Sequence, residues 1–442
     1  MQREESATER RQAWFIHDRF GLFIHWGIYA CAARHRDKGL AEWIKSSEKI
    51  NDEAYQRYFD HFDPDLYDPA TWAHLAKQAG MRYAVITTKH HDGFCLWDSR
   101  LTEYKATRTP AGRDLIRPWV EAFRAEGLKV GFYYSLLDWH HPAFPIDGLH
   151  PQRDDMQARA AGQRDVRTYA DYLHGQVREL LTNYGIIDIL WLDFSYPQRD
   201  WGWARGKGKE DWQSERLVKM IRELQPALLL NNRAEVDPDF YTPEQVQPRG
   251  WVQLHGQRVP WEACQTLNGS WGYDRDNQDW KSPDLLVRML IDSVSNGGNM
   301  LLNVGPTARG VFDAHAQAIL EAIGQWMRLH GRSIYGATQS EFAPPPDCRF
   351  TQRGDRLYLH IYSWPLKSIH LPELAGRVVY AQLLNDGSEI QMRTDPTNTT
   401  ELEAMQTTSE MQTEAGTLTL DLPIQRPDVL VPVIELFLKR EE

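Results

Sequence analysis

The feature of this sequence that most constrains its fold is a recurring unit, in which an amphipathic helix leads through a glycine into a buried strand. The unit occurs in "PATWAHLAKQAGMRYAVITTKHH", "LIRPWVEAFRAEGLKVGFYYS" and "YLHGQVRELLTNYGIIDILWLDF". Gly80, Gly127 and Gly185 stand where the end of a helix requires a positive φ angle. The strands are nearly continuous apolar runs, which is typical of a parallel sheet covered by helices.

Further segments extend this series along most of the chain. "RLVKMIRELQPALLLNNR" uses Pro226 as the helix stop, "GLFIHWG" and "NMLLNVG" read as additional strands, and helices are expected around Pro283–Ser295 and Asp313–His330. Repeated βα units of this kind predict a (β/α)8-type barrel. The alternative is an open doubly wound sheet, but no glycine-rich dinucleotide turn follows the first strand.

The pattern changes near "EFAPPPDCRF", where three prolines end the helical periodicity. The segments "RLYLHIYSW", "VVYAQLLNDG", "TLTLDLP" and "DVLVPVIELFLK" alternate with period two, which predicts a small antiparallel β-sandwich. We therefore expect a barrel domain at residues 1–338 and a sandwich domain at residues 339–442. The polar stretch Asn398–Gly416 is expected to be a long exposed loop.

Composition excludes several classes of function. A net charge of −11 disfavours a nucleic-acid partner. No apolar run is long enough to span a bilayer, so no membrane partner is expected, and the charged start "MQREESATERRQAWF" has no apolar signal segment, so a cytoplasmic location is expected. The 4 cysteines are scattered without a CxxC pair, which disfavours a disulfide framework or a cysteine-rich zinc site.

Polar side chains follow the predicted strands at equivalent positions. In a barrel, the residues just past the C-terminal ends of the strands line one face, and catalysis takes place there. The residues at these positions are His25, His90, His91, Tyr133, Asp193 and Arg233. Their convergence predicts a pocket with several titratable groups.

Each of these residues also has a structural interpretation. Asp193 follows an apolar strand, where a carboxylate is costly without partners, and Arg233 is available to keep it ionised. Alternatively, Asp193 caps the turn before "SYP" and Arg233 forms a surface ion pair. The histidines could equally be buried core residues.

A metal site is the main chemical alternative for the histidines. Zinc needs three or four converging ligands, and no HExxH motif is present. His90 and His91 are consecutive, so on an ideal strand they point to opposite faces. Both reach one pocket only if the strand has already ended, as Asp92 and Gly93 indicate.

Several motifs, in order along the chain, resemble the α-L-fucosidases of glycoside hydrolase family 29. They are "RFGLFIHWG", "EWI", "TKHHDGF", "GFYYS", "WLDF", "NNR", "WEACQTLNGSWGY" and "NGGNMLLNVGP", from about Phe20 to Tyr335. The resemblance implies a barrel of the (β/α)8 type, usually followed by a β-sandwich. It also implies retaining exo-hydrolysis of terminal fucose without a metal or other cofactor.

The resemblance also assigns roles to residues. It makes Asp193 of "WLDF" the nucleophile and places Trp271 of "SWGY" beside the sugar's methyl group. The residues expected to bind the sugar are His25, Glu42, Trp43, His90, His91, Tyr133 and Arg233. On this interpretation the histidine pair binds the hydroxyl groups of the sugar.

Two glutamates compete for the role of acid/base. Glu244 in "DFYTPEQ" follows "NNR" in a loop, from which an acid can approach the leaving oxygen. Glu262 in "PWEAC" is the alternative, with a strong motif around it. We favour Glu244, and interpret Glu262, beside Trp261, as structural.

A fucosylated oligosaccharide or glycoside is thus the expected substrate. Two other functions stay open from sequence alone: a carbohydrate-binding protein without catalysis, and a glycosidase for a fucose-like sugar such as L-galactose. The oligomeric state does not follow from the sequence.

Overall fold

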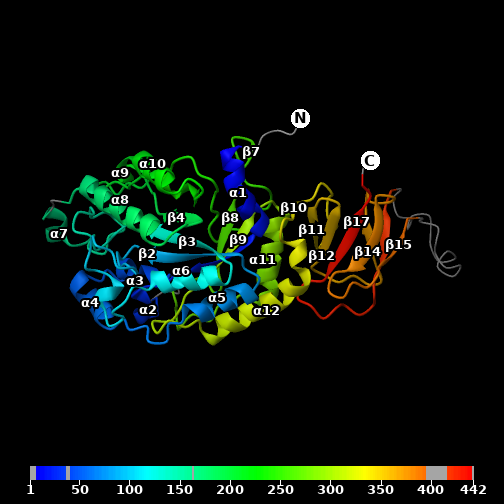
Figure 1. Ribbon diagram of the computed structural model, residues 1–442, viewed down its shortest axis with the longest axis horizontal. Coiled ribbons are helices and arrows are strands. Elements are labelled where there is room, and N and C mark those ends of the chain that lie inside the picture. Colours follow the sequence, from blue (N-terminus) through cyan, green and yellow to red (C-terminus); the bar gives the residue numbers. More distant parts are fainter. Residues whose placement is uncertain (1–5, 36–39, 162–163, 395–415, 441–442) are drawn as a thin grey trace.

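The computed structural model describes residues 6–35, 40–161, 164–394 and 416–440. Within these residues, a parallel sheet with its helices forms the larger part of the molecule, and antiparallel sheets form the C-terminal part (Figure 1). Helices α11 (Pro283–Ser295) and α12 (Ala314–His330) lie between the two parts.

The described residues of the larger part contain a curled sheet of seven strands in the order β5-β4-β3-β2-β1-β9-β8. Every neighbouring pair in it is parallel. The strands are β1 (Phe20–Ile24), β2 (Tyr83–Lys89), β3 (Lys129–Ser135), β4 (Ile189–Asp193), β5 (Leu229–Leu230), β8 (Glu262–Thr266) and β9 (Asn299–Val304). Because all strands run the same way, their C-terminal ends share one edge, and the predicted barrel-type fold is confirmed.

Residues 240–244 fill the gap between the two edge strands, β5 and β8. Isolated parallel bridges join this segment to both neighbours, at Asn231 with Phe240, Tyr241 with Trp261, and Glu244 with Cys264. Pro243 lacks the backbone N–H that a regular strand would need, although its carbonyl accepts from Cys264 N at 3.1 Å. The barrel is therefore closed by an irregular segment that ends at Glu244.

Asp239 anchors the start of the closing segment. Its Oδ1 accepts from Arg11 Nη2 at 2.9 Å, and its Oδ2 accepts from Arg222 Nη2 at 2.6 Å and from Leu230 N at 2.8 Å. Asp239 is buried, so charge-assisted bonds of this kind offset its desolvation. One carboxylate thus ties the segment to α1, α10 and β5.

Helices cover the outside of the parallel sheet. The longer ones are α1 (Ala7–Asp18), α4 (Asp52–Asp60), α5 (Pro69–Gln78), α6 (Ile116–Ala125), α8 (Val166–Asn183) and α10 (Ser214–Leu224), with α11 and α12. Short helical turns are α2 (Tyr29–Ala32), η1 (Ala41–Trp43), α3 (Ile44–Ser47), η2 (Ala106–Arg108), α7 (Met156–Ala160), α9 (Lys209–Trp212), η3 (Asn232–Ala234) and η4 (Gly331–Ser333). Gly80, Gly127 and Gly185 have φ angles of +86°, +72° and +74°, as their positions after helices require.

Strand β8 was not expected from the sequence. Its residues, "EACQT", include only two apolar side chains, Ala263 and Cys264, beside a buried glutamate, glutamine and threonine. They therefore lack the apolar run that marks the other strands. The strand is stable because β9 pairs with it along its whole length. Tertiary pairing therefore overrides the weak local signal here.

The C-terminal part forms the predicted antiparallel sandwich. One sheet has the order β10-β11-β12-β17-β14 and the other β13-β16-β15, and side chains from both sheets share one apolar core. The strands are β10 (Thr338–Gln339), β11 (Cys348–Arg353), β12 (Arg356–Ile361), β13 (Ser368–Leu371), β14 (Val378–Leu383), β15 (Gln391–Arg393), β16 (Leu418–Asp421) and β17 (Val433–Leu438).

The sandwich is joined to the barrel by specific polar contacts. Trp326 Nε1 of α12 donates to the Val431 carbonyl at 2.8 Å, and Arg349 of β11 pairs with Asp292 of α11 at 2.7 Å.

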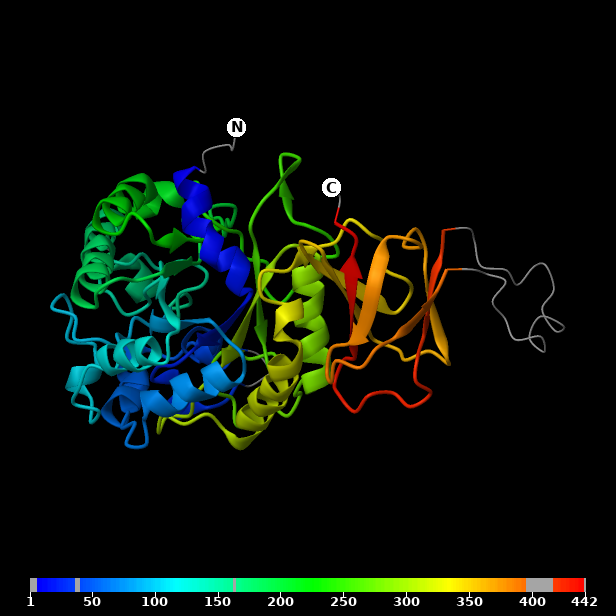
Figure 2. The same cartoon turned by 45° about the vertical axis from the view of Figure 1, so that its right-hand side comes forward.

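The domain boundary between residues 338 and 339 stays a prediction, as does the loop at Asn398–Gly416, which lies almost entirely outside the described residues. The hairpin of β6 (Gln253–Leu254) and β7 (Gln257–Arg258) projects from the barrel (Figure 2).

None of the helices in the described part of the chain has both the length and the hydropathy that a bilayer-spanning segment requires.

The contact between α12 and α5 gives a first prediction. A Cβ added at Gly324 of α12 would lie 2.3 Å from the Gln78 carbonyl oxygen, which is backbone and cannot rotate away. We expect Gly324→Ala to lower the free energy of unfolding by about 1–3 kcal/mol, although alanine has the better helix propensity. Urea unfolding followed by circular dichroism measures this change.

Gly250→Ala is the matched control, because nothing lies within 4 Å of its added Cβ. If both variants unfold at the same urea concentration as the parent protein, the proposed close packing of α12 on α5 is wrong.

Candidate active site

Two cavities differ sharply in the chemistry of their walls. One, of about 1190 Å³, lies between α5 and α12, and the other, of about 80 Å³, lies at the C-terminal ends of the barrel strands. The smaller one is the candidate active site, because Asp193 and Glu244 both line it and a catalytic pair of carboxylates needs such proximity. Its lining residues are Phe23, His25, Leu40, Glu42, Trp43, His90, His91, Tyr133, Trp191, Asp193, Phe194, Glu244, Cys264 and Trp271.

Asp193 is the last residue of β4, where the strand direction delivers its carboxylate into the cavity. Its Oδ2 accepts from the Tyr133 hydroxyl at 2.7 Å, and its Oδ1 accepts from Arg233 Nη1 at 3.2 Å. Burial raises the pKa of Asp193, while the charge of Arg233 acts in the opposite direction and favours the ionised carboxylate.

Arg233 joins Asp193 to the second carboxylate. It lies in η3, and its Nη2 donates to Glu244 Oε2 at 2.8 Å. Its Nε donates to Thr242 Oγ1 at 2.9 Å, so the guanidinium plane is fixed from a third direction. One guanidinium thus holds both carboxylates on the same side of the cavity. Arg233 itself is not among the cavity-lining residues.

The histidine pair enters the cavity because β2 ends at Lys89, just before it. The pairing of β2 with β3 shifts between Thr87 and Lys89, which breaks the strict alternation of side chains. The ring centroids of His90 and His91 are 4.0 Å apart, and both rings line the cavity.

Hydrogen bonds fix the tautomer of His91. The Ser135 hydroxyl donates to the Leu137 carbonyl at 2.8 Å, so its oxygen accepts the proton of His91 Nδ1 at 2.7 Å. Burial holds the pKa of His91 well below its usual value, so the ring is neutral. Its Nε2 therefore presents a lone pair, 3.9 Å from Asp193 Oδ2. A ligand hydroxyl can donate to it.

His25 is oriented in the same way by Asn303 of β9. The amide of Asn303 donates to the Trp271 carbonyl at 2.7 Å, and its oxygen accepts from His25 Nδ1 at 2.7 Å. Burial lowers the pKa of His25 to about 3, so its Nε2 is also an acceptor. Asn303 was missed in the sequence, although it stands near the end of the predicted strand "NMLLNVG".

Two buried polar atoms in the cavity have no hydrogen-bond partner among the described residues. They are Glu42 Oε1 and His90 Nδ1. The other oxygen of Glu42 accepts from Gly272 N at 2.8 Å, and burial raises the pKa of this carboxyl to about 7. Buried polar atoms are normally paired, so these two indicate a ligand that brings hydroxyl groups.

Aromatic rings form the rest of the wall. Trp43 contacts both His91 and Phe194, with ring centroids 4.9 and 5.2 Å apart, and Trp271 packs against His25 at 5.0 Å. Sequence reasoning missed the lining residues Phe23, Leu40, Trp191, Phe194 and Cys264. Phe23 and Trp191 could have been found, because each stands two residues before a predicted site residue on the same face of its strand.

Glu262 lies apart from the cavity. It is the first residue of β8, so it belongs to the N-terminal end of the barrel, whereas Asp193 ends β4. Its carboxylate accepts from the Tyr83 hydroxyl and from Trp191 Nε1, the latter at 3.3 Å, and it is fully buried. Since the Trp191 ring lines the cavity, Glu262 supports the wall of the cavity from behind.

Within the described residues, no group of three or more His, Cys, Asp or Glu side chains is placed to hold a metal ion. In His25 and His91, moreover, Nδ1 is already bonded to a side chain of the protein.

The known proteins to which this chain is similar are α-L-fucosidases. The family model described as "Alpha-L-fucosidase" matches residues 1–332. The solved structure of α-L-fucosidase isoenzyme 1 from Paenibacillus thiaminolyticus is 47% identical, covers 98% of this chain and 100% of that chain, and has a TM-score of 0.89. Among curated proteins, the α-L-fucosidase of Dictyostelium discoideum is 27% identical over 74% of this chain and 71% of its own length.

A third relative is an α-L-fucosidase from Bacteroides thetaiotaomicron. It is 26% identical with a TM-score of 0.81, and the match covers 99% of this chain and 97% of that chain. It was solved as a trapped covalent intermediate with 2-fluoro-fucosyl fluoride.

The buried Glu262 generates a prediction about stability and pH. Burial raises its pKa from 4.5 to about 7 in the folded protein, so the folded state binds this proton more tightly than the unfolded chain. The resulting stabilisation is complete below pH 4.5 and is lost as pH rises through 7, which amounts to roughly 3 kcal/mol. We expect Glu262→Gln to remove this part of the decline in melting temperature between pH 5 and pH 8.

Glu121→Gln, on the exposed face of α6, serves as the control and should follow the parent protein at every pH. A Glu262→Gln protein whose melting temperature falls with pH as steeply as that of the parent would contradict the prediction.

Proposed function

This chain belongs to the α-L-fucosidase family of glycoside hydrolases, and from this premise we propose that it releases terminal fucose by a retaining double displacement. The substrate is a fucosylated oligosaccharide or glycoside. In this proposal Asp193 is the nucleophile and Glu244 is the acid/base.

One observation carries the assignment: the Arg233 guanidinium contacts Asp193 at 3.2 Å and Glu244 at 2.8 Å. Retaining glycosidases need two carboxyl groups roughly 5–5.5 Å apart, one to attack the sugar and one to move protons. Two carboxylates on one guanidinium meet the need for proximity. The covalent intermediate trapped in the Bacteroides thetaiotaomicron relative supports a covalent route.

In the first step, a carboxylate oxygen of Asp193 attacks C1 of the fucosyl ring. The bond from C1 to the leaving oxygen breaks, and Glu244 gives that oxygen its proton. Arg233 and the Tyr133 hydroxyl keep Asp193 ionised and oriented before the attack. The products are a fucosyl ester of Asp193 and the free aglycone.

In the second step, water attacks C1 from the face that the aglycone left. Glu244, now a carboxylate, takes a proton from this water, and the C1–Asp193 ester bond breaks. Two inversions restore the original configuration, and Asp193 and Glu244 return to their starting states.

The remaining cavity residues are proposed to bind the sugar. The neutral rings of His25 and His91 each offer a nitrogen lone pair, and Glu42 offers an unpaired oxygen. Fucose carries several hydroxyl groups that can donate to these acceptors. Trp271 offers an aromatic wall for the C5 methyl group. In this proposal the histidines bind hydroxyl groups and coordinate no metal.

The nucleophile assignment predicts the behaviour of Asp193→Ala. We expect turnover of an aryl α-L-fucoside to fall by roughly 10³–10⁶-fold, because no covalent intermediate can form. Added azide should restore part of the activity and give a β-fucosyl azide, because azide fits the space of the lost carboxylate. Proton NMR identifies the product, and near-parental rates without azide would rule out Asp193 as the nucleophile.

The acid/base assignment predicts a different pattern for Glu244→Ala. A general acid contributes about 10²–10⁴-fold, and most of this where the leaving group is poor. We therefore expect Glu244→Ala to slow hydrolysis of a fucosyl disaccharide far more than that of a fucoside with an acidic phenol. Rates of the glycosylation step for the two substrates measure this dependence.

Glu262→Gln is the matched control for this experiment, because it removes a buried carboxylate of the same barrel without entering the cavity. It should affect both substrates by the same factor. The opposite result, with leaving-group dependence in Glu262→Gln and none in Glu244→Ala, would exchange the two roles.

A further inference from the structure

The cavity of about 1190 Å³ lies at the end of the barrel away from Asp193. Its walls come from the end of α1, the end of α5, the residue before β2, the second half of α12, η4 and the end of β11. Since Arg82 precedes β2 while Asp193 ends β4, the cavity opens on the N-terminal face of the parallel sheet. We call it the basic cleft.

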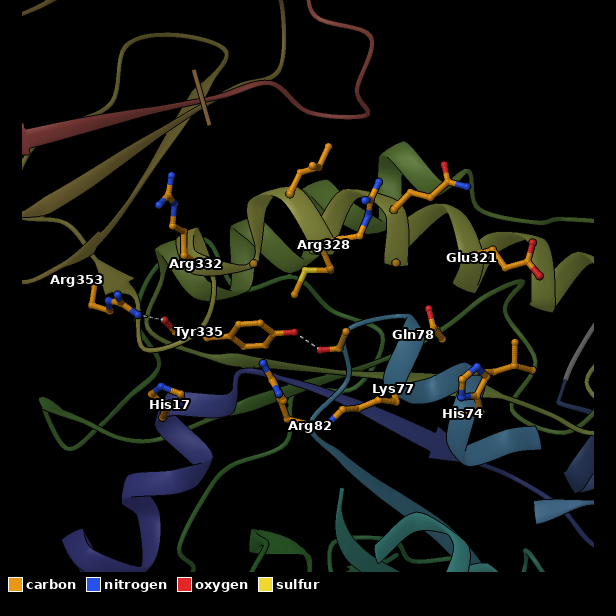
Figure 3. A pocket seen from close by; sticks show the side chains of 17 residues that line it. His17, His74, Lys77, Gln78, Arg82, Glu321, Arg328, Arg332, Tyr335 and Arg353 are labelled. Carbon is orange, nitrogen blue, oxygen red and sulfur yellow. Dashed lines mark hydrogen bonds between the residues drawn. The ribbon is translucent and has the colours of Figure 1, made fainter. Parts of the chain in front are cut away.

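Basic side chains dominate this cleft (Figure 3). They are His17, His74, Lys77, Arg82, Arg328, Arg332 and Arg353, whereas Glu321 is the one acidic residue among the described residues that line it. The whole chain has a net charge of −11, so a cavity lined mainly by basic side chains differs from the average charge of the protein. In Figure 3, Lys77 and Arg82 lie on one side of Tyr335, and Arg328 and Arg332 lie on the side of α12.

Some of these basic groups already have acidic partners. Arg332 pairs with Glu435 at 3.0 Å, His17 with Asp18 at 2.9 Å, and His74 with Glu126 at 3.4 Å. The described residues provide no carboxylate partner for Lys77, Arg82, Arg328 or Arg353. Cations that line one cavity repel one another, so this set favours an anion that lies among them.

The geometry of the cleft fixes one of these cations in advance. The Arg82 guanidinium lies over the Tyr335 ring, 4.2 Å from its centroid, and the Tyr335 hydroxyl donates to the Gly80 carbonyl. A guanidinium held in this way loses little freedom when it binds an anion. Lys77 and Arg328 stand in the last turns of α5 and α12, where the partial negative charge of a helix end stabilises a cation.

We propose that the basic cleft binds a ligand with at least two tetrahedral oxyanion groups, either phosphate groups or sulfate esters. Guanidinium groups match such oxyanions with paired hydrogen bonds, and they reach the cleft from different elements. The cleft is far larger than one inorganic ion requires. The ligand would contact α5 and α12 of the barrel together with β11 of the sandwich, so its binding would also hold the two parts together.

Isothermal titration calorimetry tests the proposal on the full-length protein in low-salt buffer without phosphate or sulfate. The probes are inorganic pyrophosphate and a sulfated heparin tetrasaccharide, which represent the two sources of the same chemistry. We expect at least one of the two probes to bind the parent protein. A double variant that carries both Arg82→Gln and Arg328→Gln should bind that probe about tenfold more weakly or worse. Whichever probe binds more tightly identifies the source.

Arg178→Gln is the matched control, because Arg178 is an exposed arginine on α8 and does not line the cleft. It should bind the probes within about twofold of the parent protein. All variants should keep the parent's turnover of an aryl fucoside, so this test stands independently of the catalytic assignments. The proposal is overturned if neither probe binds the parent protein, or if the double variant binds as tightly as Arg178→Gln.

Discussion

The candidate active site depends on how the barrel is closed. Seven strands of the described residues form the parallel sheet, and residues 240–244 span the remaining gap through isolated bridges to both edges. Asp239 ties the start of this segment to three other elements, and the bridge to Cys264 fixes its end at Glu244. A regular strand would pair along its whole length. The irregular segment instead brings a carboxylate from the rim to the guanidinium that also contacts Asp193.

The burial of the site residues and the positive charge of Arg233 set the electrostatics of the site. The cavity desolvates Asp193 and Glu42 and raises the pKa of each carboxyl, while Arg233 partly offsets this effect at Asp193. The same burial keeps His25 and His91 neutral, and their bonds to Asn303 and Ser135 leave the other ring nitrogen as an acceptor. A site that combines carboxylates with neutral imidazole acceptors suits a polar, uncharged sugar.

The two ends of the barrel have opposite chemistry. At the C-terminal ends of the strands, the cavity combines carboxylates with aromatic rings, whereas at the N-terminal ends the basic cleft gathers arginines and a lysine. Glu262 lies within the barrel between them, bonded to Tyr83 and Trp191. In our proposals, an anion binds at one end of the molecule without contact with Asp193 and Glu244 at the other.

Local sequence determined the positions that parallel strands must bring together. His25, His90, His91 and Asp193 each follow or end an apolar run, whereas Tyr133 lies two residues before the end of β3. Parallel strands end at one edge, so the convergence of these residues followed from the pattern alone. The tertiary structure decided what has no local signal: strand β8, the closing segment, the separation of Glu244 from Glu262, and the basic cleft. These depend on long-range pairing and on contacts between residues distant in the chain, whereas a periodic pattern reports only on neighbours within one element.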